Sequence, residues 1–96
     1  MDTSLVDPLG RVMTLHDHTW FGHILKGHPE LAHDRPLVEQ AVRSPTTIRF
    51  SKVSAECRVY YGVGPTGLLI AVVADVVGGY VRTAYRTRAA KGAVEW

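Results

Sequence analysis

The chain contains a single cysteine, Cys57, so it cannot form a disulfide within itself. Disulfides mark oxidising compartments, and their absence predicts a cytoplasmic protein in which Cys57 packs within a strand. Long apolar stretches are also missing, because the longest, 68–77, contains Asp75 and is far shorter than the ~20 residues that cross a bilayer. Residues 1–15 lack the basic start and apolar centre of a signal peptide. We therefore expect a soluble chain with no membrane partner.

Motifs for metal or nucleophilic chemistry are missing as well. The chain has five histidines, namely His16, His18, His23, His28 and His33. They form no HxxxH pair, no CxxC is present and no carboxylate stands at metal-motif spacing. His16 and His23 could share one helix flank, but two ligands do not close a site. No GxSxG marks a nucleophilic serine. The sequence thus predicts neither a metal nor another cofactor.

Basic residues are concentrated in the second half of the chain, although the formal net charge is only +2. Residues 43–96 contain eight Lys and Arg against three Asp and Glu, whereas residues 1–42 contain three against six. A basic half is compatible with a polyanionic partner such as nucleic acid. Solvated strand faces also collect Arg and Lys, so the charge alone leaves both interpretations open.

The first half is typical of helices that follow a loose lead-in at 1–9 and a short strand at 11–15. At helical spacing, one arc of roughly 140° collects four apolar residues, namely Trp20, Phe21, Ile24 and Leu25. Such an arc predicts a helix face that packs on the core. Gly27 can end this helix, and Pro36 can open another over 37–43.

Beyond Pro45 the spacing changes from helical to extended. Alternation and β-branched residues predict strands at 46–51, 56–63, 68–77 and 80–87. Ala93 and Val94 of the basic tail can add an edge strand. We therefore expect one α+β domain over residues 1–96, with two or three N-terminal helices packed on a roughly four-stranded antiparallel sheet.

A histidine beside an apolar helix stripe, together with Arg, Tyr and Thr on a sheet, matches the needs of metal-independent RNA cleavage. The 2′-hydroxyl must lose a proton, the leaving 5′-oxygen must gain one, and the pentavalent phosphorane needs positive charge. Histidine suits both proton transfers, and the arginine fork suits the phosphorane. His23 stands about 60° outside Trp20, where one ring nitrogen can reach a ligand. Alternatively, His23 and His28 are boundary residues that brace the helix turn.

The order of several short motifs also resembles a known family. A W..HI...HPE helix, a YY strand, a TAY strand and a K-G-x-x-x-W ending occur here as Trp20, His23, Ile24, His28, Pro29, Glu30, Tyr60, Tyr61, Thr83, Ala84, Tyr85, Lys91, Gly92 and Trp96. In this order, from about Gly10 to Trp96, they resemble the phage-type nuclease-fold domains of the barnase, EndoU, colicin and RelE-like superfamily. The resemblance implies helices ahead of a four-stranded antiparallel sheet, ribonuclease or toxin activity, RNA as substrate and an antitoxin as protein partner.

The chemistry and the resemblance together assign roles to eight residues. The catalytic set is His23 as general acid or base, His28 as its partner or as a brace, and Thr83 and Tyr85 at the scissile phosphate. The substrate-binding set is Arg58, Tyr60, Arg82 and Lys91. On a regular strand Arg82 lies on the face opposite Thr83 and Tyr85, so one of these assignments has to be wrong, and the resemblance favours Thr83 and Tyr85. The alternative function is a noncatalytic module that binds nucleic acid or a protein on the same basic sheet.

Overall fold

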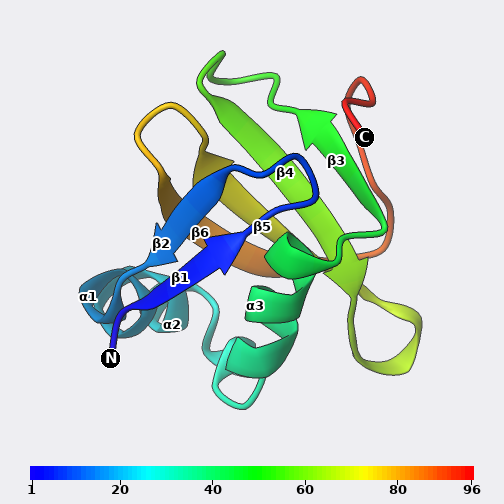
Figure 1. Ribbon diagram of the computed structural model, residues 1–96. Helices are drawn as coiled ribbons and strands as arrows, with labels where there is room; N and C mark the ends of the chain where they lie inside the picture. The colour runs from blue at the N-terminus through cyan, green and yellow to red at the C-terminus, as the bar shows by residue number, and fades with distance from the viewer.

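A computed structural model describes all 96 residues and contains one six-stranded sheet in the order β1-β2-β6-β5-β4-β3 (Figure 1). Its strands are β1 (Thr3–Val6), β2 (Val12–Leu15), β3 (Thr47–Phe50), β4 (Cys57–Val63), β5 (Leu69–Asp75) and β6 (Tyr80–Thr87). Neighbouring strands are antiparallel except β2 and β6, which run parallel and meet at a single register pair, Thr14 and Tyr80. The sheet is therefore mixed.

All the helices except one short turn lie between β2 and β3. Three consecutive segments, α1 (Asp17–Thr19), the π-helical η1 (Trp20–Ile24) and α2 (Leu25–Gly27), make one continuous helix, called helix 17–27 below. The short turn η2 (Pro29–Leu31) leads to α3 (Arg35–Arg43), and η3 (Pro65–Gly67) joins β4 to β5. None of these helices is long and apolar enough to cross a membrane.

The core lies between α3 and one face of the sheet. Val38, Ala41 and Val42 of α3 are buried there with Ile70 and Val72 of β5. The sheet curves around α3, which contacts β1 as well as β4 and β5. Trp20 and Ile24 of helix 17–27 belong to the same core. Helix 17–27 thus closes one end of the core beside β6.

The predicted fold class is wrong in its sheet and in its order of elements. The sheet has six strands and a parallel pair, and only helix 17–27 and α3 exceed one turn. Both follow a hairpin, β1-β2, of which the alternation at 11–15 predicted only the second strand. Joining this hairpin to β6 depends on contacts distant in sequence, which local patterns do not encode.

The predicted loose lead-in at 1–9 is also wrong, because residues 3–6 form β1. Leu5 is fully buried opposite Met13, and Gly10, at φ 82°, turns the chain back toward β2. Asp7 accepts hydrogen bonds from the backbone N–H groups of Leu9 and Arg11, at 2.9 and 2.8 Å. A carboxylate that satisfies two turn amides holds the hairpin closed.

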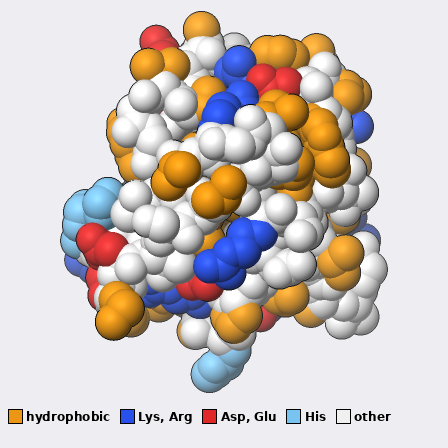
Figure 2. All heavy atoms as spheres, in the orientation of Figure 1, with side chains coloured by type: hydrophobic (Ala, Val, Ile, Leu, Met, Phe, Trp, Pro, Cys, Tyr) orange, Lys and Arg blue, Asp and Glu red, His pale blue; other side chains and the backbone are white.

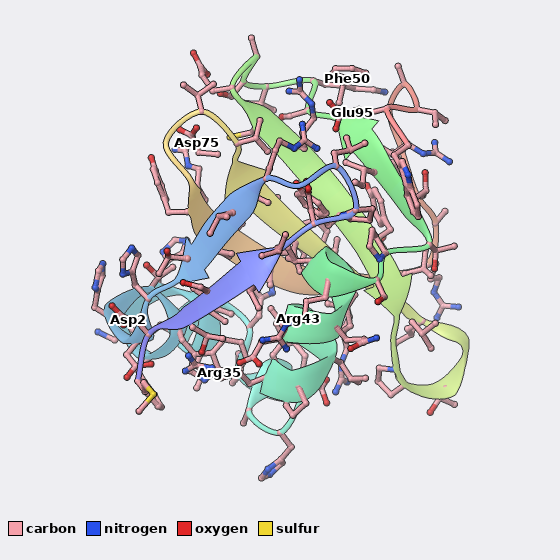
Figure 3. All side chains as sticks on the ribbon, in the orientation of Figure 1. Asp2, Arg35, Arg43, Phe50, Asp75 and Glu95 are labelled. Carbon is pink, nitrogen blue, oxygen red and sulfur yellow. The ribbon has the colours of Figure 1, made fainter.

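The C-terminal tail contacts β3 where Ala93 and Val94 were expected to add an edge strand, but it forms only an isolated bridge and no strand. Val94 forms an isolated bridge with Arg49, and the Phe50 N–H donates to the Ala93 carbonyl at 2.9 Å. Glu95 then reaches the α3 side of the sheet, where it lies near Phe50 in Figure 3. Its carboxylate binds Arg11 and Arg58, with nitrogen to oxygen distances of 2.6 and 2.8 Å. Glu95 therefore connects the tail to the N-terminal hairpin through Arg11 and to β4 through Arg58.

Candidate functional site

The sheet face that points away from α3 carries a second, smaller apolar cluster. Val59 and Tyr61 of β4 and Ala71 of β5 form its centre, and Tyr85 of β6 and Ala90 of the tail pack against it. Alternation along β4 sends these side chains to the side opposite the core. We call this side the outer face.

Three pockets adjoin one another along the outer face. The central pocket, of about 270 Å³, is lined by His23, Ser51, Val53, Ser54, Cys57, Val73, Arg82 and Thr83. The histidine cleft, of about 600 Å³, is lined by His16, His18, Thr19, Gly22, His23, Tyr80, Val81 and Arg82. The tyrosine pocket, of about 240 Å³, is lined by Phe50, Ser51, Lys52, Val53, Val59, Tyr61, Val73, Tyr85 and Lys91. The central pocket shares residues with both neighbours, and no pocket is lined by Asp or Glu.

His23 reaches the central pocket because helix 17–27 is widened at its middle. The Leu25 N–H bonds to the Trp20 carbonyl, five residues back, instead of the usual four. Each residue then turns through a smaller angle, so Ile24 lies directly above buried Trp20 instead of about 40° around the helix toward Phe21. The buried side of the helix is thereby turned away from Phe21, which is 61% exposed. The prediction that Phe21 belongs to the core stripe is wrong for this reason. His23 is exposed to solvent rather than sealed beneath Trp20.

Arg82 reaches the same pocket through an irregularity in β6. Val73 pairs with Thr83 and the next residue, Ala74, pairs with Val81, so Arg82 is one residue more than β5 can match. Such a bulge breaks the alternation of faces. Arg82 and Thr83 consequently both line the central pocket. The expectation that Arg82 excludes Thr83 from the site is therefore wrong.

The Arg82 guanidinium forms no ion pair, and the nearby carboxylate of Asp75 acts on it only through its charge. Its Nη1 lies 3.6 Å from the Sγ of buried Cys57, and this is its only side-chain contact of hydrogen-bond type. The pKa of Arg82 is raised above its usual value, first by Cys57 and then by Tyr80 and Asp75. Arg82 therefore carries a positive charge that is not held in an ion pair.

Across the molecule, basic side chains divide into paired and free ones. Five form ion pairs with carboxylates, namely Arg11, Arg35, Arg43, Arg58 and Arg86. On the α3 side, Lys and Arg atoms lie next to Asp and Glu atoms at several places (Figure 2). The three basic residues that line the pockets, Lys52, Arg82 and Lys91, form no ion pair. Unneutralised positive charge thus gathers on the outer face.

His28 lies near the site but lines none of its pockets. Its ring centroid is 6.0 Å from that of Tyr85, and its Nδ1 is 3.5 Å from a Glu30 carboxylate oxygen. Tyr85 itself lines the tyrosine pocket. Burial, followed by the neighbouring Tyr61, raises the pKa of Tyr85. His28 therefore contacts the site through Tyr85, in the position of a brace.

Arg58 and Tyr60, predicted to bind substrate, lie on the α3 side instead. Tyr60 is fully buried, and its hydroxyl donates to Asp7 at 2.5 Å. Burial, together with the Asp7 carboxylate, raises the pKa of Tyr60. Arg58 is held by Glu95 and stacks at 4.3 Å over the Phe50 ring. Both residues support the fold, because the pleat of β4 points them away from the outer face.

Three further residues line these pockets but were not among the predicted site residues, namely His16, His18 and Cys57. The rings of His16 and His18 stack with centroids 5.1 Å apart, and His16 Nδ1 lies 3.0 Å from an Asp2 oxygen. At the left edge of Figure 2, histidine atoms project where α1 lies in Figure 1. The interval of seven residues between His16 and His23, about two helical turns, was the available signal. No group of three or more His, Cys, Asp or Glu side chains is arranged to hold a metal ion.

No protein-family model, curated protein or solved structure matches this chain. Its function therefore has to be inferred from its residues and their geometry.

Proposed function

We propose that this chain is a metal-independent endoribonuclease whose reaction centre is the central pocket. The observation that carries the proposal is that His23, Arg82 and Thr83 line one pocket, and that no Asp or Glu lines it. A titratable imidazole beside an unpaired guanidinium is a combination suited to phosphodiester cleavage. The motif order that resembles nuclease-fold domains supports the same activity.

Each reaction step has a candidate group in or beside this pocket. Neutral His23 takes the proton of the ribose 2′-hydroxyl as its oxygen attacks phosphorus. The O2′–P bond forms and the P–O5′ bond breaks, leaving a 2′,3′-cyclic phosphate and a 5′-hydroxyl end. Arg82 binds the equatorial oxygens of the phosphorane, and the Thr83 hydroxyl donates a hydrogen bond to them.

The leaving 5′-oxygen needs a proton donor, which has to be a second group because His23 acts as the base. His16 and His18 line the histidine cleft, which shares His23 and Arg82 with the central pocket. We assign this role to one of the two, in place of His28. His28 then acts as a positioning residue through its contact with Tyr85.

The test is to replace His23 with alanine and to compare it with His33→Ala, because His33 is exposed and lines no pocket. Cleavage of a single-stranded RNA should fall about 100-fold or more in His23→Ala and stay unchanged in His33→Ala, while both variants melt like the wild type. Cleavage should persist in EDTA, and a 2′-deoxy nucleotide at the scissile position should abolish it. Wild-type protein that binds RNA but cleaves none between pH ~5 and ~9 would end the enzyme proposal.

The second candidate function is a noncatalytic module that binds nucleic acid on the outer face. It is favoured by one observation, that His23 is the only histidine lining the central pocket.

In either case we place the protein in the cytoplasm, where the lone Cys57 stays reduced. If it is a toxin, as the resemblance implies, its antitoxin has to cover the outer face.

A further inference from the structure

The tyrosine pocket has no part in the proposed chemistry, yet it is built unlike the central pocket. Six of its nine lining residues are hydrophobic, namely Phe50, Val53, Val59, Tyr61, Val73 and Tyr85. The central pocket shares Ser51, Val53 and Val73 with it, so the two pockets have a common wall. A ligand bound over Arg82 therefore extends directly into an apolar pocket.

Positive charge stands at the tyrosine pocket as well. Lys52 and Lys91 line it, are exposed, and form no ion pair. The backbone N–H of Lys91 donates to the Tyr61 hydroxyl at 3.2 Å, which fixes the tail at this place. An apolar, aromatic pocket with two free ammonium groups matches a flat ring attached to a phosphate.

We propose that the tyrosine pocket binds the base of an unpaired nucleotide next to the phosphate held by Arg82. This inference rests on the proposed function for its placement, and it identifies the substrate as single-stranded RNA. The Tyr85 ring, held by His28, offers an edge or face to the base, while Val59 supplies an apolar floor. A base in a duplex is stacked and paired, so it cannot enter such a pocket without being extruded.

The test measures binding separately from cleavage. A fluorescent RNA oligonucleotide with 2′-deoxy substitution at the scissile position is titrated by anisotropy, as a single strand and as a duplex. Val59→Phe fills the pocket from the outer face of β4. Val63→Phe is its control, because Val63 lies on the same face of β4, is 74% exposed and lines no pocket.

We expect Val59→Phe to weaken single-strand binding about tenfold or more, which is the effect of losing one base-stacking contact. Val63→Phe should leave binding unchanged. The wild type should bind the single strand more tightly than the duplex. Equal affinity for both forms, or wild-type affinity in Val59→Phe, overturns the inference.

A second pair of variants covers the case in which Val59→Phe fails to fold. Val53 is 96% exposed, so Val53→Asp places a negative charge at the pocket without disturbing the core. Val77→Asp, at a residue that is 79% exposed and lines no pocket, is the control. Val53→Asp should weaken binding by a similar factor and Val77→Asp should not; unchanged binding in Val53→Asp overturns the inference.

The two proposals fail separately. If the wild type cleaves no RNA but Val59→Phe loses binding, the base pocket stands and the ribonuclease proposal falls. If the wild type cleaves RNA and Val59→Phe binds and cleaves equally well, the ribonuclease proposal stands and the base pocket falls.

Discussion

His23 and Arg82 reach one pocket through two insertions of the same size. Helix 17–27 carries one extra residue in its π-helical turn, and β6 carries one extra residue opposite β5. Both kinds of insertion are common beside functional sites, where they re-aim a side chain. The chemistry-bearing residue types could be identified from the sequence. Their meeting place could not, because regular helix and strand angles send Phe21 and Arg82 to the wrong sides.

Asp7 shows at the same scale how a single carboxylate couples stability to pH. Burial acts to raise the pKa of Asp7, but hydrogen bonds from Tyr60 and Arg11 outweigh burial and hold it below its usual value. A depressed carboxyl pKa stabilises the fold above the unfolded-state value of about 4, and this contribution is lost as the pH falls through the folded-state pKa.

We expect Tyr60→Phe to lower the free energy of unfolding by about 1.5–3 kcal/mol at pH 7, because it removes a buried hydrogen bond to a charged group. The difference from wild type should shrink as the pH falls below the unfolded-state value of about 4 toward the lower folded-state pKa of Asp7. Urea unfolding at pH 7 and pH 3 measures both effects. Tyr80→Phe, with a 38% exposed side chain, is the control, and a loss in Tyr60→Phe that is equal at both pH values would contradict this account.

At the scale of elements, the parts with local signals were predicted well. The strands expected at 46–51, 56–63 and 80–87 match β3, β4 and β6, because alternation is a local property. The helix expected at 37–43 lies within α3. β1 was missed because its four residues show little alternation, and Leu5 is buried only where the folded hairpin joins the core under α3.

The contact between α3 and β4 depends on a glycine. A Cβ at Gly62 would lie 2.6 Å from the Ala41 Cβ and 2.7 Å from its Cα, so α3 crosses β4 where both residues are small. We expect Gly62→Ala to destabilise the protein by about 1–3 kcal/mol through overpacking. Chemical denaturation measures this, with Gly27→Ala as the control because its Cβ would meet nothing within 4 Å. Equal stability of the two variants would mean that α3 can shift freely on β4.

At the scale of the whole molecule, the positive surface is determined by which basic residues form ion pairs, and not by the net charge. The formal net charge of +2 conceals a surface on which carboxylates neutralise the basic groups of the α3 side and leave those of the outer face free. The excess of Lys and Arg in residues 43–96 predicted a basic surface. Which basic residues remain free could not be predicted, because Arg58 finds its partner, Glu95, only in the folded chain.

RNA binding should therefore weaken as salt rises, since each neutralised phosphate releases counterions. Lys52→Ala and Lys91→Ala should each lower the slope of log affinity against log salt by about 0.7, the value for single strands. Lys26→Ala should not change the slope, because Lys26 is exposed but lines no pocket. Anisotropy titrations at several salt concentrations measure the slopes. Binding that ignores salt in all four proteins would indicate a protein partner instead.

The parallel pairing of β2 with β6 means that the sheet can be completed only after β6 has been synthesised. A ribosome delivers the β1-β2 hairpin long before β6, yet the hairpin has no other strand to join, since Thr14 pairs only with Tyr80 between these two strands. Until β6 emerges, Leu5, Met13 and Leu15 have no complete core to enter. Before β6 is made, the hairpin therefore lacks part of its burial, and partly exposed apolar surface of this kind can recruit chaperones or other nascent chains.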